Sequence, residues 1–127
     1  TPGDYEISNM VGIATHLFEP LREYVGGPIK INSMFRSVDL NTAIGGSKSS
    51  QHCQGRAIDL DDTFGYKTNA DMFNYIKNNL NFDQMIWEFG NDKNPAWVHV
   101  SYVSGDQNRN RILIAEKVNG KTNYRIE

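Results

Sequence analysis

The hydrophobic positions near the start of the chain repeat with the spacing of an amphipathic helix. Apolar side chains recur at intervals of three and four residues, at Ile7, Met10, Val11, Ala14, Leu17, Phe18 and Leu21. This pattern predicts a helix over residues 5–25, capped by Asp4 or Ser8 and ended by Gly26-Gly27-Pro28. Pro20 lies inside the pattern. A break or kink is expected just before it, because proline lacks the amide hydrogen and clashes with the preceding turn.

Strands are predicted where apolar and polar side chains alternate, because successive side chains of a strand point to opposite faces. Four such stretches occupy residues 29–35, 57–61, 82–89 and 96–102. A second helix is predicted over residues 69–80, with Thr68 or Asn69 as its cap. In the tail, Asn119-Gly120 separates two further runs and predicts a β-hairpin over residues 111–126 that extends or covers a sheet.

The composition indicates a small folded domain and narrows the function only a little. The 127 residues are 39% hydrophobic, which is enough for one soluble globular domain over residues 1–127. A net charge of −2 gives no electrostatic reason to expect nucleic acid or membrane partners. No apolar run approaches the ~18 residues of a transmembrane helix, and no signal peptide begins the given chain. The single cysteine, Cys53, forms no internal disulfide and leaves the compartment open.

Three side chains that suit zinc lie in two separate stretches. His52 and Asp59 are close in the chain, and His99 lies in an alternating stretch from Trp97 to Tyr102. Gly55 permits a tight turn that brings His52 back over Asp59. The alternative is a buried histidine and a helix-capping aspartate that do not contact each other. Imidazole and carboxylate are zinc ligands, and a catalytic zinc site typically has three protein ligands and a water. We therefore predict a metal site formed by His52, Asp59 and His99.

The hairpin that carries His99 also places an acidic side chain. If its loop has an even number of residues, two registers are open. One sets Glu88 opposite Trp97 and diagonal to His99, and the other sets it directly opposite His99, so the two share a face in both. An odd loop or a bulge puts them on opposite faces. A carboxylate close to a zinc ligand is therefore expected, with a surface glutamate as the alternative.

Other polar residues have an ordinary and a functional interpretation. Arg36 follows the first predicted strand, where it is either a solvated charge or a guanidinium that grips a substrate carboxylate. His16 is expected to be at the surface or partly packed. Cys53 is expected to be a small buried residue rather than a thiolate ligand. Residues 38–50 are interpreted as a flexible loop into the metal motif, since Gly45-Gly46 lacks the ending of a phosphate-binding loop.

Together these residues resemble the signature of the M15 zinc peptidases, the group of D-alanyl-D-alanine carboxypeptidases and phage endolysins. That signature is Ser-x-His-x-x-Gly-x-Ala-x-Asp, followed downstream by a strand with a second histidine. Each fixed position is met, by Ser50, His52, Gly55, Ala57 and Asp59, and then by His99. Phe35-Arg36-Ser37 is similar to the family's arginine-serine segment after its first strand. The resemblance covers residues 17–102 and leaves out the last hairpin.

The resemblance implies an α+β fold, hedgehog/DD-peptidase-like, with helices packed against a mostly antiparallel sheet. It implies Zn2+ bound by His52, Asp59 and His99, and substrate contacts from Arg36 and Ser50. The implied substrate is a peptidoglycan stem peptide. Such a protein is expected in the cell wall or periplasm, outside the cell, or as a phage or prophage product, and we expect a monomer.

One position departs from the family pattern. Several subgroups carry the catalytic glutamate three residues before the second histidine, and here that residue is Ala96. Shorter members carry a segment similar to Ile86-Trp87-Glu88, so the resemblance assigns Glu88 as the general base. The expected function is zinc-dependent hydrolysis of peptide bonds in peptidoglycan, as a carboxypeptidase or an endopeptidase. The alternative is a non-catalytic, zinc-stabilised module that binds the cell wall or a partner.

Overall fold

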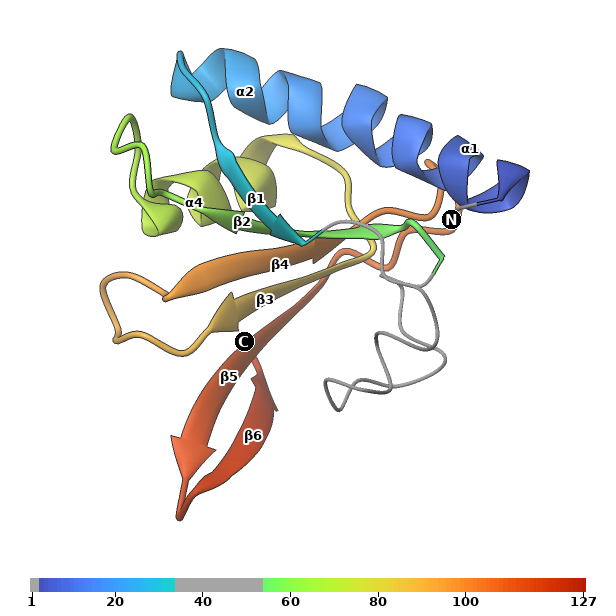
Figure 1. Cartoon of the computed structure of the whole chain (residues 1–127). Coiled ribbons are helices and arrows are strands. Elements are labelled where there is room, and N and C mark those ends of the chain that lie inside the picture. The colour runs from blue at the N-terminus through green and yellow to red at the C-terminus, as the bar shows by residue number, and fades with distance from the viewer. Residues whose placement is uncertain (1–2, 34–53) are drawn as a thin grey trace.

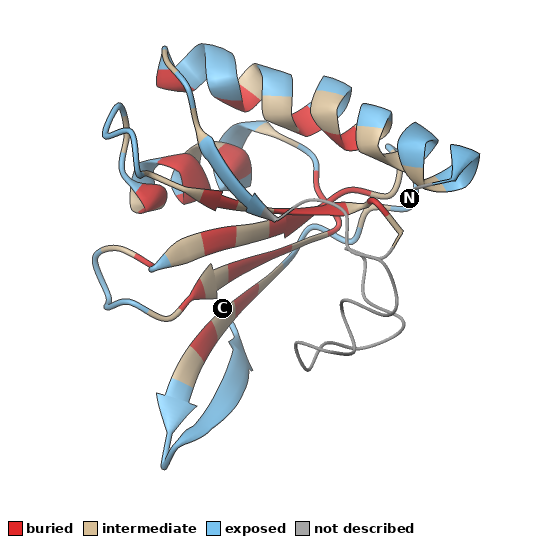
Figure 2. Ribbon diagram, in the orientation of Figure 1, coloured by how far each residue is buried: buried red, intermediate tan, exposed pale blue. Residues whose placement is uncertain are grey.

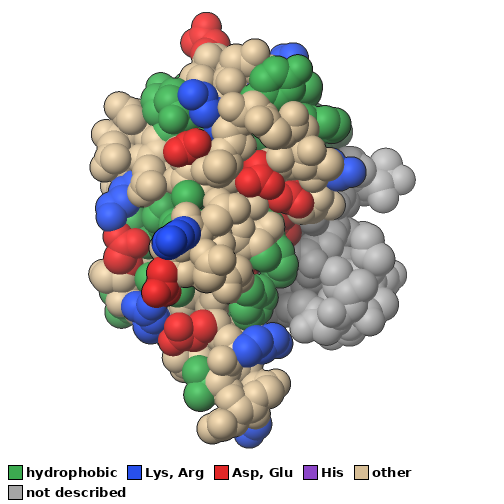
Figure 3. Space-filling model, turned by 90° about the vertical axis from the view of Figure 1, so that its left-hand side faces the viewer, with side chains coloured by type: hydrophobic (Ala, Val, Ile, Leu, Met, Phe, Trp, Pro, Cys, Tyr) green, Lys and Arg blue, Asp and Glu red, His purple; other side chains and the backbone are tan. Residues whose placement is uncertain are grey.

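The computed structural model describes residues 3–33 and 54–127, so Arg36, Ser50, His52 and Cys53 lie outside the described residues. Helices cover one face of a mostly antiparallel sheet (Figure 1). The predicted α+β fold is therefore confirmed. Acidic and basic side chains are interspersed on the face shown in Figure 3. Within the described ranges, no helix combines the length and the apolar character needed to cross a membrane.

The N-terminal helix is one continuous run of three parts, α1 (Asp4–Ile13), η1 (Ala14–Phe18) and α2 (Glu19–Val25). It starts after Gly3 with no side-chain cap, so the predicted capping role of Asp4 or Ser8 is wrong. The helix is not broken before Pro20, but its regular α-helical pattern is interrupted there, where the sequence predicts a break or kink. The preceding turn is a π-helix, and this wider turn accommodates the missing amide hydrogen and the proline ring. Gly26 ends the helix in the left-handed conformation, with φ at 79°.

The sheet has six strands in the order β1-β2-β4-β3-β5-β6. Their bounds are β1 (Lys30–Ser33), β2 (Ala57–Asp61), β3 (Gln84–Glu88), β4 (Trp97–Ser101), β5 (Arg111–Val118) and β6 (Lys121–Ile126). Each lies inside a predicted strand. Neighbouring strands pair antiparallel except β3 and β5, which run parallel. The tail hairpin extends the sheet, and Asn119 and Gly120 have the positive φ angles of a type I′ turn.

The two faces of the sheet differ in what covers them. On the first face, the long helix and α4 (Asn69–Asn79) pack on a buried apolar layer formed by alternate strand residues, Ile58, Leu60, Met85, Val98 and Val100. Figure 2 shows buried segments on the strands and on the helices above them. The second face carries a smaller buried cluster of Ile86, Leu113 and Ala115. This second face also carries Asp59, Glu88 and His99.

Two polar contacts hold the connections around the strands. Thr68 caps α4 in a capping box, in which Thr68 Oγ1 accepts from the Asp71 amide and the Asp71 carboxylate accepts from the Thr68 amide. Arg109 donates from Nε and Nη2 to the two carboxylate oxygens of buried Asp83, each at 2.9 Å. That hydrogen-bonded pairing with Asp83 raises the pKa of Arg109. Because the Asp83 carbonyl also accepts from the Arg111 amide, the ion pair lies where the parallel pairing of β3 and β5 begins.

Candidate active site

Asp59 and His99 lie side by side on the second face of the sheet. They are directly opposite each other on β2 and β4. His99 Nδ1 lies 2.9 Å from Asp59 Oδ1, within hydrogen-bond distance. Both side chains are mostly buried, with 14% of the His99 side chain and 16% of the Asp59 side chain exposed. Cross-strand pairing thus brings together two of the three predicted zinc ligands.

The chain enters β2 through a tight turn against the first helix. Gly55 has φ at 71°, and a Cβ there would lie 2.5 Å from the Glu6 carbonyl oxygen, so only glycine fits. Asn9 Nδ2 donates to the Gln54 carbonyl at 2.7 Å and holds the same turn. The predicted tight turn is confirmed. His52 precedes it and lies outside the described residues, so its position over Asp59 stays a prediction.

Glu88 shares the face of Asp59 and His99. The observed register pairs Glu88 with Trp97 and Ile86 with His99, which is the first of the two predicted registers. Glu88 is therefore diagonal to His99 on the neighbouring strand. Only 7% of Glu88 is exposed, so it is not a surface glutamate. A carboxylate buried this far is retained where it has polar or ionic partners, as in a catalytic or metal site.

Two aromatic residues neighbour Glu88, Phe89 in the chain and Trp97 across the strand pairing. Phe89 has φ at 55°, in the left-handed region, and its ring packs on the Ile86, Leu113 and Ala115 cluster. It also meets the Trp97 ring edge to face, with centroids 5.5 Å apart. Strand alternation alone predicts Phe89 on the opposite face from Glu88. The left-handed turn reverses that, and sequence reasoning missed it because φ is not visible in a hydrophobic pattern.

Asn69 connects three elements behind the site. Its carboxamide donates at 3.1 Å to Asp61 Oδ1 and to the carbonyls of Pro95 and Ala96. Asn69 is 1% exposed, and its contact with the Pro95 carbonyl is buried. These hydrogen bonds fasten the end of β2 to the loop that leads into β4, and so support the register that places His99. Sequence reasoning considered Asn69 only as a helix cap, and nothing in its context signals this role.

The same contacts act on a neighbouring acid. Burial of Asp61 opposes ionisation, but hydrogen bonds outweigh it, chiefly those from the Asn69 side chain and the Asp62 amide. Together they lower the pKa of the Asp61 carboxyl below its ordinary value of 3.8. Asp61 therefore stays ionised where it ends β2.

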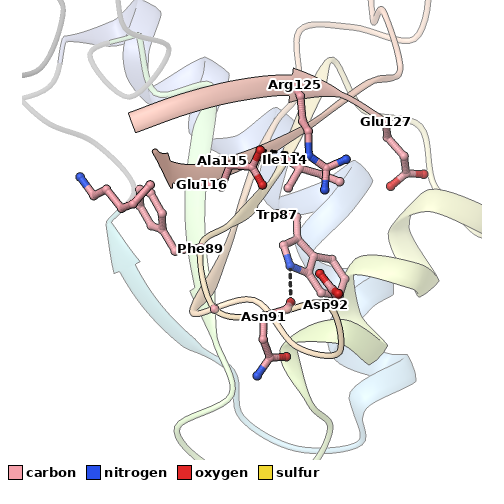
Figure 4. Close-up of a pocket in the computed structure, with 11 residues that line it drawn as sticks. Trp87, Phe89, Asn91, Asp92, Ile114, Ala115, Glu116, Arg125 and Glu127 are labelled. Atoms are coloured by element: carbon pink, nitrogen blue, oxygen red, sulfur yellow. Dashed lines mark hydrogen bonds and ion pairs between the residues drawn. The ribbon is translucent and has the colours of Figure 1, made fainter. Parts of the chain in front are cut away.

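A cleft of about 530 Å³ opens between the loop after β3 and the tail hairpin (Figure 4). The Trp87 indole lines it and donates to the Asn91 carbonyl at 3.0 Å. Arg125 and Glu116 form an ion pair on its other side, 3.3 Å apart. Asp59, Glu88 and His99 are not among its lining residues. The cleft therefore adjoins the predicted site at Phe89 and Ala115 without containing it.

The remaining predicted residues fall outside this arrangement. His16 is exposed on the first helix and stacks on the Tyr102 ring, with centroids 5.3 Å apart, in agreement with its expected surface position. Arg36 and Ser50 lie outside the described residues, so their substrate contacts stay predictions. Ala96 is exposed directly before β4. Glu88 is thus the acidic side chain that the structure brings to the Asp59–His99 pair.

Asp59 and His99, the two predicted zinc ligands within the described residues, suit zinc in chemistry and spacing. Within residues 3–33 and 54–127, no group of three or more His, Cys, Asp or Glu side chains is close enough to hold a metal ion. The third predicted ligand, His52, is outside those ranges. Ligand atoms about 2.0–2.1 Å from a tetrahedral zinc lie roughly 3.3 Å apart. The 2.9 Å between His99 Nδ1 and Asp59 Oδ1 is close to that spacing.

The family profile described as Peptidase M15 matches residues 7–101. The match covers about three quarters of the chain and begins earlier than the expected residue 17. It contains Asp59, Glu88 and His99, and it stops before β5 and β6. No curated protein sequence matches the chain. The family match and the residues gathered on the second face agree, and the chain belongs to the M15 family of peptidases.

Proposed function

We propose that this protein is a zinc-dependent peptidase that hydrolyses an amide bond in peptidoglycan stem peptides. The observation that carries the proposal is the Asp59–His99 pair beside buried Glu88, on one sheet face of an M15 chain. An acid and an imidazole at ligand spacing, with a second acid diagonal to them, suit metal-assisted hydrolysis. The zinc ion and the peptidoglycan substrate are both inferred from the family and from these residues.

His52, Asp59 and His99 would hold the metal. When bound, zinc polarises the scissile carbonyl and lowers the pKa of a water toward ~7. Asp59 would supply negative charge, and its Oδ1, 2.9 Å from His99 Nδ1, places the two ligand atoms toward the same point. The burial of both side chains keeps them from rotating into solvent.

Glu88 acts as the general base in this proposal. It takes the proton of the attacking water and passes it to the nitrogen of the leaving amine as the carbon–nitrogen bond breaks. A base of this kind contributes ~10²–10⁴ in rate. Its burial excludes bulk water, which strengthens charge interactions at the reacting atoms.

Substrate binding is assigned to Arg36 and Ser50. A guanidinium binds a carboxylate through two parallel hydrogen bonds, so Arg36 would orient a carboxylate of the stem peptide. If that carboxylate is the terminal one, the enzyme is a carboxypeptidase that releases D-alanine. If it is an internal one, the enzyme is an endopeptidase of the endolysin type.

The test is cleavage of purified peptidoglycan and a synthetic stem pentapeptide, with zinc and after chelation, with products identified by mass. Loss of D-alanine that chelation abolishes indicates a carboxypeptidase, and internal cuts indicate an endopeptidase. Glu88→Gln should keep its zinc and lose turnover by about 10²–10⁴. Glu116→Gln, a matched change on β5, should leave both unchanged.

Two results would overturn parts of this proposal. Full turnover by Glu88→Gln rejects Glu88 as the base. No cleavage by a folded, zinc-loaded wild-type protein rejects the peptidase and favours a non-catalytic module that binds the cell wall.

A further inference from the structure

The tail hairpin extends the face that carries Glu88. Glu88 pairs with Ala115 of β5, and Ala115 pairs with Tyr124 of β6. Paired residues of neighbouring strands share a face, so Glu88, Ala115 and Tyr124 form one row across three strands. Ala115 is small and buried, whereas Tyr124 is 54% exposed. The row therefore ends in an accessible phenol on the side of Glu88 away from Asp59 and His99.

A cation lies next to this row. Lys117 is two residues along β5 from Ala115 and so shares its face. Its Nζ donates to Thr122 Oγ1 at 3.1 Å and lies 5.3 Å from the centroid of the Phe89 ring. Both contacts direct the ammonium group along the second face. The Phe89 ring, which lies against it, belongs to the residue next to Glu88 in the chain. β5 and β6 lie outside the residues that the family profile matches.

We propose that Tyr124 and Lys117 form a substrate subsite beside Glu88 that binds a carboxylate group of the peptide. The inference deepens the proposed function and rests on it. The phenol and the ammonium group are both hydrogen-bond donors, and a carboxylate accepts from both. The substrate would then extend from the Asp59–His99 pair, past Glu88, to the tail hairpin.

Electrostatics support a protonated phenol as the donor. Partial burial raises the pKa of Tyr124, and the negative charge of Glu88 raises it further. Glu88 also repels a bound carboxylate, but the strand spacing sets the Cα atoms of Glu88 and Lys117 roughly 8 Å apart, and we take this as the distance from Glu88 to the ligand. The ligand would contact Lys117 at about 3 Å, so attraction exceeds repulsion more than twofold in the same medium.

The kinetic test uses pairs of stem peptides. In each pair, one peptide keeps a given carboxylate and the other carries a carboxamide at that position, and a separate pair is made for each carboxylate of the stem peptide. For the peptide pair that reports the subsite, Lys117→Met and Tyr124→Phe should each raise KM for the carboxylate form by roughly tenfold. kcat should stay unchanged, and neither variant should affect the amidated form. Lys121→Met is the control on the same hairpin, since Lys121 pairs with Val118 and so points to the other face. Tyr66→Phe is the control for an equally exposed tyrosine.

A second measurement needs no activity. In Glu88→Gln the pKa of Tyr124, followed by ultraviolet absorbance and assigned with Tyr124→Phe, should fall toward its ordinary value, because the added charge is gone. An unchanged pKa would contradict the juxtaposition and overturn the subsite. Equal KM changes for every carboxylate and carboxamide form would overturn it as well.

Failure of the subsite and failure of the proposed function are distinguishable. If wild-type protein cleaves none of these peptides, the proposed function fails. Calorimetric binding of the same peptides to wild-type and Lys117→Met protein then decides the subsite. Carboxylate-dependent binding that Lys117→Met removes supports it, and equal binding of all peptides rejects it.

Discussion

The two faces of the central strands place stability and chemistry on alternate residues. Leu60 and Val98 are buried under the helices, while their neighbours Asp59 and His99 point to the second face and contact each other. The first face is apolar and closely packed, so it contributes most of the hydrophobic free energy. The second face holds acidic and imidazole groups that are mostly buried, which costs free energy unless they have partners. Adjacent positions in the chain therefore have different roles, one in the stability of the fold and the next in the candidate site.

The largest expected effect is a loss of turnover when a residue of the second face is changed. Asp59→Asn is nearly isosteric but removes the negative charge of a proposed zinc ligand, so turnover should fall by more than about 10³-fold as several kcal/mol of metal-assisted stabilisation are lost. The metal-free protein should unfold with a free energy changed by less than about 1 kcal/mol, since the side chain still fits. Zinc content, kcat and urea titration measure the three quantities. Asp106→Asn, in an exposed loop, is the control. Full activity of Asp59→Asn would reject Asp59 as a zinc ligand.

The next change tests the neighbouring residue. Leu60→Ala should lower the unfolding free energy by about 2–5 kcal/mol, because it deletes fully buried methyl groups and leaves a cavity under the helices. Urea unfolding measures the loss. At a temperature where the variant is folded, zinc content and turnover should stay within about twofold of wild type. A large loss of turnover in the folded variant would show that the two faces are coupled.

Asn69→Ala tests the connection between the faces. Removing the carboxamide leaves the Pro95 and Ala96 carbonyls without this buried donor, which should cost about 1–3 kcal/mol in unfolding free energy. Because the loop into β4 then loosens, turnover should fall as well, unlike in Leu60→Ala. Thr68→Ala removes only the cap of the same helix and should cost ~1 kcal/mol without affecting turnover. Equal turnover in both variants would contradict the connection.

The smallest expected effect is on the stability of the fold at acid pH, through Asp61. The pKa of Asp61 is lower in the folded protein than its ordinary 3.8, so the folded state is stabilised above pH 3.8. That stabilisation is lost as the pH falls through the lower, folded-state value. Asp61→Asn should therefore show a shallower loss of stability in this acid range than wild type, measured by urea titration at several pH values. An identical slope would contradict the ionised contact with Asn69.

The sequence by itself determined much of the secondary structure and the chemistry of the site. The strand at residues 57–61, the helix that starts at Asn69 and the Asn119-Gly120 turn follow from local patterns, and the structure confirms them. These features depend on propensities and periods that a short window contains. At Pro20 the local pattern predicts a break or kink, and the structure shows no break but a π-helical turn that interrupts the regular α-helix just before it.

Only the tertiary structure decided how the pieces meet. The choice between two hairpin registers, the 2.9 Å contact of His99 with Asp59 and the parallel pairing of β3 with β5 depend on contacts distant in sequence. The turn at Phe89 and the buried network of Asn69 depend on φ angles and hydrogen bonds that no periodicity encodes. A sequence pattern states which side chains share a face of one strand. Long-range backbone pairing sets which strands are neighbours, and with that which acids and imidazoles lie close enough to act together.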